Sequence, residues 1–352
     1  MINRRVVLQA GLATLAVPAI ARAQTLRGSI AVMAYAGIFQ DNYTKAVVAP
    51  FQQAFPDVKV NYVTAGTSAQ MLGSIRAQKQ DPQVDVAIMD VTTSSIANAE
   101  GLFEKLTPDK VPSLNELFPE ARAAGGEFGP AVTFDHLVLA YDTQNLKPPI
   151  TKLADLWRPD LQGLLSISAP PNIQGLALTA MVEKMEGGDY RKSIDAAIQK
   201  LRTLAPSVKT FEPNPDGYSL ILNGVVRVAT GWNARSQLYG DQTQGRIGTL
   251  LPPEGSVFQI NTINVTTGSK NRDAALAFAN YALSQTAQKA FTELMFYGPT
   301  NAKAVIDPAA IARTAAAPES RSRMINVDWN EIVKVRDQWN NRWRREIIAA
   351  AR

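Results

Sequence analysis

Cysteine is absent from this chain of 352 residues, which excludes a disulfide framework, a zinc–thiolate site and a cysteine nucleophile. The chain also lacks internal repeats and low-complexity segments, and beyond residue 23 no apolar run is long enough to span a bilayer. With 19% charged and 46% hydrophobic residues, the composition is typical of a soluble globular protein. The length is sufficient for two α/β lobes, each with its own core.

Histidine occurs only once, at His136, directly after Asp135. Neighbouring side chains on a strand point to opposite faces, so these two cannot form a catalytic relay. We therefore expect a structural histidine, no catalytic residues and no enzymatic activity.

The first 23 residues have the features of an export signal. Arg4 and Arg5 precede an apolar run over residues 6–20, and Ala21-Arg22-Ala23 has the form of a cleavage site. The twin arginine is compatible with either the general secretory route or the twin-arginine route, and both stay open. Cleavage after Ala23 would remove three arginines and no acid, lowering the formal charge from +5 to +2. The remaining charge gives no reason to expect nucleic-acid binding.

The segment that follows alternates between strand and helix patterns, which predicts a mainly parallel sheet covered by helices. The predicted elements are strand 29–34, helix 42–55, strand 58–63, helix 69–79 and strand 85–89. Asp41 is predicted to cap the first helix, and Pro50 to kink or break it.

Two apolar, β-rich runs stand apart from this alternation. They cover residues 131–141 and 257–265, and turn residues bound both of them. We interpret them as two crossings between two lobes, with a ligand bound in the cleft between the lobes.

Several stretches make the chain resemble the periplasmic solute-binding proteins of ABC importers, in the branch that includes the spermidine/putrescine receptors. Each motif is weak alone, but their order after an export signal is specific. They are residues 51–60, 85–90 with 101–106, 153–163, 223–232 and 268–301. The resemblance implies a two-lobed α/β fold, each lobe a mixed sheet flanked by helices, joined by two hinge crossings. It also implies a protein that closes on its ligand and delivers it to an ABC permease in the inner membrane.

On this basis residues 24–133 and 262–323 are predicted to form the first lobe, and residues 134–261 and 324–352 the second. Residues 324–352 carry a tryptophan stripe at helical spacing, which predicts an amphipathic helix docked on the second lobe.

The candidate ligand-binding residues lie at strand ends, helix starts and crossings, where a closing cleft takes its polar groups. They are Tyr35, Gly37, Thr67, Ser68, Asp90, Thr92, Phe134, Asp135, Asn172, Gln174, Trp232, Asn233, Arg235 and Asn261.

Several of these candidates have a purely structural alternative. Asp90 could cap the helix that follows it. Asp135 could pair with a cation at the hinge, and Tyr35 and Trp232 could be hinge packing. Arg235, directly after a Gly-Trp strand end, suits the capture of a carboxylate.

The second crossing bears on the charge of the ligand. Polyamine receptors, which the chain resembles, carry an acid and a nearby tryptophan there, whereas this chain has Phe258-Gln-Ile-Asn261. One arginine opposed to one or two aspartates suits a zwitterion such as an amino acid or ω-amino acid, while a polyamine-like amine stays open.

The alternatives are a receptor for a carboxylate, a phosphonate or a ferric ion, or a non-transport enzyme on the same fold. None of the nine tyrosines is adjacent to another, which argues against iron. We expect a periplasmic monomer with no cofactor and no metal.

Overall fold

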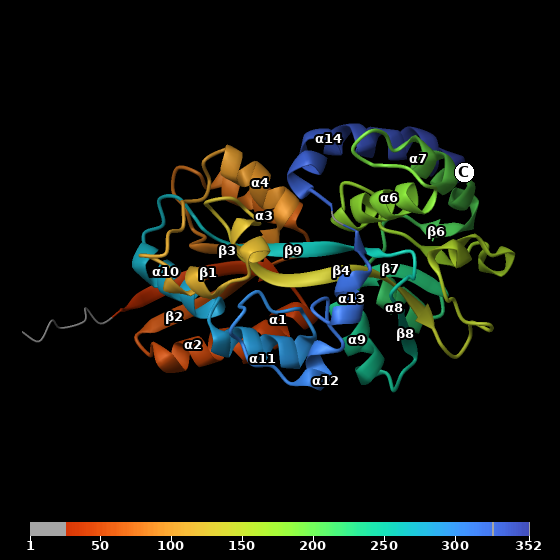
Figure 1. Ribbon diagram of the computed structural model, residues 1–352. Helices are drawn as coiled ribbons and strands as arrows, with labels where there is room; N and C mark the ends of the chain where they lie inside the picture. Colours follow the sequence, from red (N-terminus) through yellow and green to blue (C-terminus); the bar gives the residue numbers. More distant parts are fainter. Residues whose placement is uncertain (1–25, 326, 352) are drawn as a thin grey trace, which may run out of the picture.

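The computed structural model describes residues 26–325 and 327–351, so the predicted export signal lies outside the described residues. The chain forms two α/β lobes joined by long strands (Figure 1). We call the half that carries β1, β2 and β3 the first lobe, and the half that carries β5, β6, β7 and β8 the second lobe. The predicted fold class is confirmed, whereas the residue ranges of the lobes stay a prediction.

The strands follow the order β2-β1-β3-β9-β4-β7-β5-β6, with β10 beside β9 and β8 beside β4. Their bounds are β1 (Gly28–Tyr35), β2 (Val58–Ala65), β3 (Val86–Asp90), β4 (Ala131–Asp142), β5 (Leu165–Ser166), β6 (Val208–Thr210), β7 (Val228–Trp232), β8 (Ile247–Leu250), β9 (Ser256–Val265) and β10 (Met324–Ile325).

Helices cover both faces of this sheet. The α-helices are α1 (Ile38–Tyr43), α2 (Ala49–Ala54), α3 (Ser68–Ala77), α4 (Val91–Ala99), α5 (Pro119–Ala123), α6 (Ile173–Met185), α7 (Asp195–Leu204), α8 (Gly217–Leu222), α9 (Asn233–Gln242), α10 (Arg272–Ala282), α11 (Gln285–Met295), α12 (Pro308–Ile311), α13 (Pro318–Ser322) and α14 (Trp329–Arg342).

The two predicted crossings are the strands β4 and β9, which lie side by side in the middle of the molecule (Figure 1). Residues 131–136 of β4 pair with β9, and residues 137–142 pair with β7 and β8 of the second lobe. Residues 261–265 of β9 pair antiparallel with β3 of the first lobe. Each strand therefore belongs to both lobes, as a hinge strand must.

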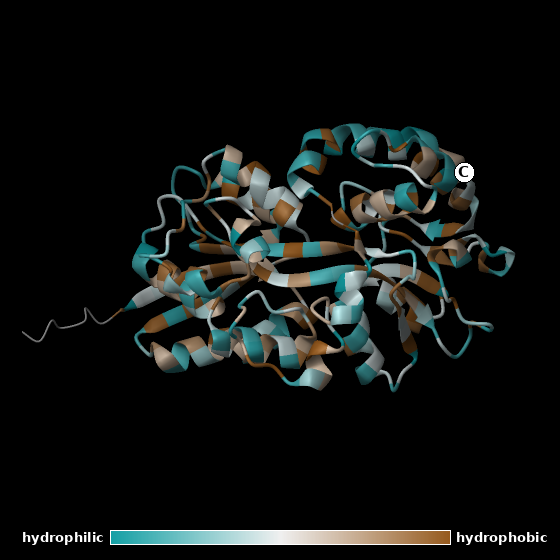
Figure 2. Cartoon of the chain, viewed as in Figure 1, coloured by the Kyte–Doolittle hydropathy of each residue, from teal (hydrophilic) through white to brown (hydrophobic). Residues whose placement is uncertain are grey.

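Alternation along the strands divides the core into layers. Val32 packs in the cluster under α1, α2, α10 and α11, while its neighbour Met33 packs in the cluster under α3 and α4. In the second lobe Leu139 faces α6, α7 and α14, and Ala140 faces α8. Figure 2 shows hydrophobic and hydrophilic residues mixed along both the central strands and the helices.

The C-terminal helix α14 packs against α4 of the first lobe and α6 of the second, and the π-helical turn that follows it (Trp343–Ile347) packs on α7. Trp339 and Trp343 are buried in the second-lobe core, and the Trp343 indole donates a hydrogen bond to the Thr179 hydroxyl at 2.9 Å. At the other end, the Trp329 indole donates to the Phe258 carbonyl of β9 at 2.9 Å. Within the described residues no helix is long and apolar enough to cross a membrane.

One local prediction, the Asp41 cap, was wrong. Asp41 does not cap the first helix, because Gly37 is its N-cap, whereas the helical segment is divided near Pro50 into α1 and α2 by one π-helical turn (Thr44–Val48). The π turn ends two residues before Pro50. Proline has no N–H, so it cannot donate the hydrogen bond that a regular α-helix would make to the preceding turn. Helix α9 was not predicted, because its polar sequence has no apolar stripe.

Candidate functional site

A cavity of about 400 Å³ lies between the two lobes, with residues of both lobes and of the hinge strand β9 in its lining. Nine of the predicted site residues line it: Tyr35, Thr67, Ser68, Asp90, Asn172, Gln174, Trp232, Arg235 and Asn261. They come from strand ends and helix starts on opposite sides, which is the arrangement that a closing cleft requires. Whether they bind a solute stays a prediction.

On the first-lobe side the polar groups of the cleft bind one another. The hydroxyls of Tyr35 and Ser68 lie 2.8 Å apart, and Tyr35 donates to the Asn261 Oδ1 of the hinge strand at 3.0 Å. The Ser68 hydroxyl also accepts the backbone N–H of Asp90 at 3.0 Å. This wall is held in place before any solute binds.

Asp90 acts as the N-cap of α4. Its Oδ1 accepts the backbone N–H of Thr93 at 2.9 Å, and it also accepts the hydroxyls of Thr92 and Thr93. The structural reading of this residue therefore holds, since both carboxylate oxygens have partners, although the residue also lines the cleft.

On the second-lobe side the loop before α6 and the end of β7 form the wall. Asn172 caps α6 by accepting the Gln174 backbone N–H at 2.9 Å. The Gln174 Oε1 accepts the Thr230 hydroxyl at 3.1 Å, and among the described residues the Gln174 amide nitrogen has no acceptor, so it is a free donor at the cleft.

Arg235 lies in the first turn of α9 and lines the cleft. Its Nε atom is buried without a hydrogen-bond partner, and no acid lies within ion-pair distance of its guanidinium in the described residues. The guanidinium carbon stands 6.0 Å from the centre of the Tyr35 ring and the guanidinium interacts with the Tyr297 hydroxyl. A half-buried cation without an ion pair creates a place for a negative charge.

The tyrosines around Arg235 do not supply that charge. Burial raises the pKa of Tyr35, Tyr218 and Tyr297 far above neutrality, so that all three are phenols. The Tyr218 hydroxyl is already occupied, because it accepts the Trp232 N–H at 2.7 Å and donates to the Trp232 carbonyl at 2.9 Å.

Five predicted site residues do not line this cavity: Gly37, Thr92, Phe134, Asp135 and Asn233. Gly37 caps α1, Thr92 donates its hydroxyl to Asp90, and the Asn233 side chain donates to the Arg313 carbonyl at 2.7 Å. Phe134 faces a second, apolar cavity of about 300 Å³ shared with Phe258 and Trp329. Side chains alternate along β9, so this cavity lies on the opposite face from Asn261.

Asp135 is buried beside the backbone of α9. Its carboxylate accepts the N–H groups of His136 at 2.8 Å and of Ala234 at 3.2 Å. Burial raises the pKa of Asp135 to about 8, and burial lowers the pKa of His136 to about 3. The contact between them uses the backbone of His136 and not its imidazole, so no relay forms.

The sequence reasoning missed several cleft residues, among them Gln259, Tyr297, Asp216, Thr230 and Arg336. Gln259 could have been found, since residues two apart on a strand share a face and Asn261 was already a candidate. Tyr297 had no such signal, because it follows the end of α11 in a turn rather than a strand end.

Residues 46–319 match the family model for bacterial extracellular solute-binding proteins. The chain belongs to this family. The expected resemblance is thereby confirmed, and the family implies a transport protein located outside the cytoplasm.

Two curated relatives and one solved structure illustrate how this solute-binding protein compares. It is 23% identical to the spermidine/putrescine-binding periplasmic protein of Escherichia coli over 300 residues, covering 84% of this chain and 81% of that protein. It is 24% identical to the γ-aminobutyric acid-binding protein of Pseudomonas aeruginosa over 293 residues, covering 80% and 79%. The periplasmic binding protein AgtB of A. tumefaciens R10, in complex with agropinic acid, superimposes with a TM-score of 0.78 at 18% identity, covering 91% and 98%.

Proposed function

We propose that this chain is the receptor of an ABC importer for a small zwitterion, an amino acid or an ω-amino acid, whose carboxylate binds Arg235. The observation that carries the proposal is the half-buried Arg235, whose Nε atom is fully buried and which lines the cleft without an ion pair in the described residues. A carboxylate placed there would form charge-assisted hydrogen bonds in a desolvated site.

The same arginine argues against a doubly charged amine. A cation in a cleft of this size lies close enough to Arg235 for the two charges to repel. The hinge strand offers the neutral amides of Gln259 and Asn261 to the cleft in place of an acid. The relatives are named for two kinds of solute, spermidine/putrescine and γ-aminobutyric acid. The charges in this cleft favour a solute of the second kind.

The amine of the zwitterion has acceptors on the second-lobe wall. Glu212 and Asp216 both line the cleft, and Asp216 caps α8 through one oxygen by accepting the Ser219 N–H at 2.8 Å. Asp90 is a weaker acceptor, because both of its oxygens already have partners.

We further propose that the protein acts as a periplasmic monomer without enzymatic activity, exported by the signal in residues 1–23. The buried neutral imidazole of His136 supports the absence of catalysis, since it cannot reach a cleft solute as a base.

Calorimetric titration of the mature chain with γ-aminobutyrate, butyrate and putrescine tests the charge assignment. The proposal expects the zwitterion to bind more tightly than either of the other two. At about 100 times its dissociation constant it should stabilise the fold by about 2.7 kcal/mol in a thermal shift. Binding of putrescine alone would overturn the proposal. Tighter binding of butyrate would favour the second candidate function, a receptor for simple carboxylates, which the unpaired Arg235 also accommodates.

A further inference from the structure

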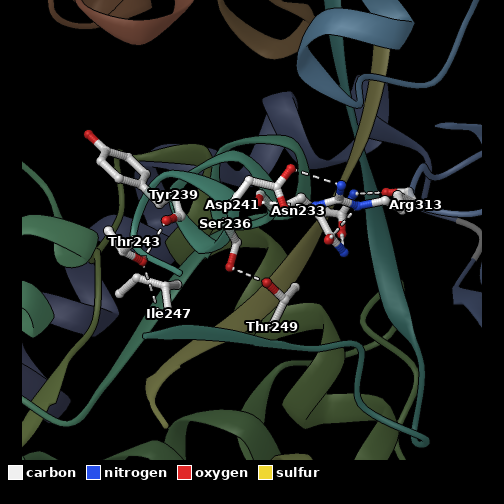
Figure 3. Close-up of polar contacts among 9 residues, drawn as sticks. Asn233, Ser236, Tyr239, Asp241, Thr243, Ile247, Thr249 and Arg313 are labelled. Atoms are coloured by element: carbon white, nitrogen blue, oxygen red, sulfur yellow. Dashed lines mark hydrogen bonds and ion pairs between the residues drawn. The ribbon is translucent and has the colours of Figure 1, made fainter. Parts of the chain in front are cut away.

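Outside the cleft, Arg313 binds one face of helix α9. Its guanidinium donates to both carboxylate oxygens of Asp241, at 2.8 and 2.9 Å. Its Nε donates to the Gln237 Oε1 at 3.1 Å, and one Nη donates to the Gln237 carbonyl at 3.2 Å. Figure 3 shows the guanidinium pointing along the helix toward Asp241.

The backbone of Arg313 binds the same helix one turn earlier. The Asn233 side chain donates to the Arg313 carbonyl at 2.7 Å, and the Gln237 amide donates to the Asn233 Oδ1 at 3.2 Å. Asn233, Gln237 and Asp241 are four residues apart, so they form a single row on α9, and Arg313 bonds to all three.

Arg313 also binds the end of α11. Its guanidinium carbon lies 3.8 Å from the centre of the Phe296 ring, a distance typical of stacking between a cation and an aromatic ring. Phe296 terminates α11 in the left-handed conformation with φ of 59°, and the next residue, Tyr297, lines the cleft. Arg313 therefore joins the helix that carries Arg235 to the turn that carries Tyr297.

We propose that Arg313 is a positioning residue that holds Arg235 against Tyr297 and so sets the affinity of the cleft for an anionic group. We call Arg313 with Asp241, Gln237 and Phe296 the Arg313 clamp. The inference rests on the proposed function, because it concerns the same anion-binding arginine.

The opposite side of α9 is fixed independently. The Ser236 hydroxyl lies 2.6 Å from the Thr249 hydroxyl of β8, as Figure 3 shows. Without the clamp, α9 keeps its attachment to β8, its direct packing on α11 and the hydrogen bond from Asn233 to the backbone carbonyl of residue 313, but loses the side-chain contacts that link it to Phe296. The expected consequence is a shift of Arg235 relative to Tyr297.

The clamp is suited to positioning more than to global stability. The side chains of Arg313 and Asp241 are 32% and 51% exposed, and partly solvated ion pairs contribute little to the free energy of unfolding. The bidentate pair and the stacking instead fix the orientation of α9 relative to the end of α11. A lysine at position 313 could not reproduce this geometry.

Arg313→Met, Asp241→Asn and Arg313→Lys test the clamp in the full mature chain. Arg76→Met is the matched control, because Arg76 forms a similar two-nitrogen pair with Glu100, from α3 to the end of α4 in the first lobe. The first measurement is amide hydrogen exchange without solute, over residues 233–242 and 296–300. We expect exchange there to rise about tenfold in Arg313→Met and to stay unchanged in the control, with β3 unchanged in both as proof of folding.

The second measurement is the dissociation constant for γ-aminobutyrate. We expect it to rise about tenfold in Arg313→Met, somewhat less in Asp241→Asn, and to be only partly restored in Arg313→Lys. Unchanged exchange in both segments would overturn the clamp. Raised exchange with an unchanged dissociation constant would overturn its role in recognition. If the wild-type chain does not bind γ-aminobutyrate, the proposed solute class fails, while the exchange data still decide whether Arg313 holds α9.

Discussion

The two walls of the cleft differ in how far their polar groups are already satisfied. On the first-lobe side, Tyr35, Ser68 and Asn261 bind one another, and the Asp90 oxygens bind the threonines of α4. On the second-lobe side, the buried Arg235 Nε and the Gln174 amide nitrogen have no hydrogen-bond acceptor within the part of the chain that the structure describes.

This difference indicates a division of labour between the walls. A network whose members satisfy one another presents a fixed surface and leaves little hydrogen-bonding capacity for a solute. A wall with unpaired donors gains much more from a solute that supplies acceptors. The second lobe should therefore determine which charge is bound, and the first lobe should determine the shape that the solute meets.

The largest expected effect is that of Arg235→Met. Removing the unpaired guanidinium should weaken the binding of γ-aminobutyrate at least about 100-fold, equivalent to about 2.7 kcal/mol, since a charge-assisted contact in a desolvated site is lost. Calorimetry measures the change. Arg344→Met, on the exposed side of the C-terminal segment, is the control and should bind as wild type does. A dissociation constant within about threefold of wild type in Arg235→Met would contradict the proposal that the second-lobe side of the cleft determines which charge is bound.

The first-lobe wall should respond in stability more than in affinity. Ser68→Ala leaves the buried N–H of Asp90 without its acceptor, which should lower the free energy of unfolding by about 1–2 kcal/mol. Urea denaturation measures this loss. Ser74→Ala on the same helix serves as the control, because no hydrogen bond of its hydroxyl occurs in the described residues. A larger loss of affinity in Ser68→Ala than in Arg235→Met would reverse the comparison.

Asp135, which lies behind the second-lobe side of the cleft, should make the free energy of unfolding fall as pH rises. Burial raises the pKa of Asp135 to about 8, so the folded chain holds a proton that the unfolded chain has already released. Stability is therefore lost as pH rises toward 8, by at most about 1.4 kcal/mol per pH unit. Asp135→Asn should flatten this fall between about pH 6.5 and 8, measured by urea denaturation at each pH.

His136 provides the control for that pH experiment. Burial lowers the pKa of His136 to about 3, so its contribution to stability is lost only as pH falls below about 6.5. His136→Gln should leave the slope above this pH as it is in wild type. An equal slope in wild type and Asp135→Asn would mean that another group titrates there.

The smallest expected effect separates zwitterions from simple carboxylates. Glu212 is exposed at the cleft, so Glu212→Gln should weaken γ-aminobutyrate binding only about two- to fivefold and leave butyrate binding unchanged. Competition calorimetry measures both solutes on the same preparation. Asp57→Asn, exposed before β2, is the control. Equal weakening for both solutes would remove Glu212 from the recognition of the amine.

Local pattern was sufficient for much of the fold. The alternation of strand and helix, the two apolar runs that became β4 and β9, and the tryptophan stripe of α14 all follow from short-range periodicity and turn chemistry. The same local chemistry placed Arg235 at a strand end facing the cleft and suggested Asp90 as a helix cap.

Only the tertiary structure decided which distant residues meet. Asp135 was predicted to be a cleft residue, but its carboxylate accepts the backbone N–H of Ala234 in α9, 99 positions away in sequence. Tyr297 and Arg313 carried no local signal, and they gain their roles because the ends of α11 and α12 pack against α9. Periodicity fixes which face a side chain occupies within its own element, whereas the neighbour it meets depends on how whole elements pack, and that information is spread over the entire core.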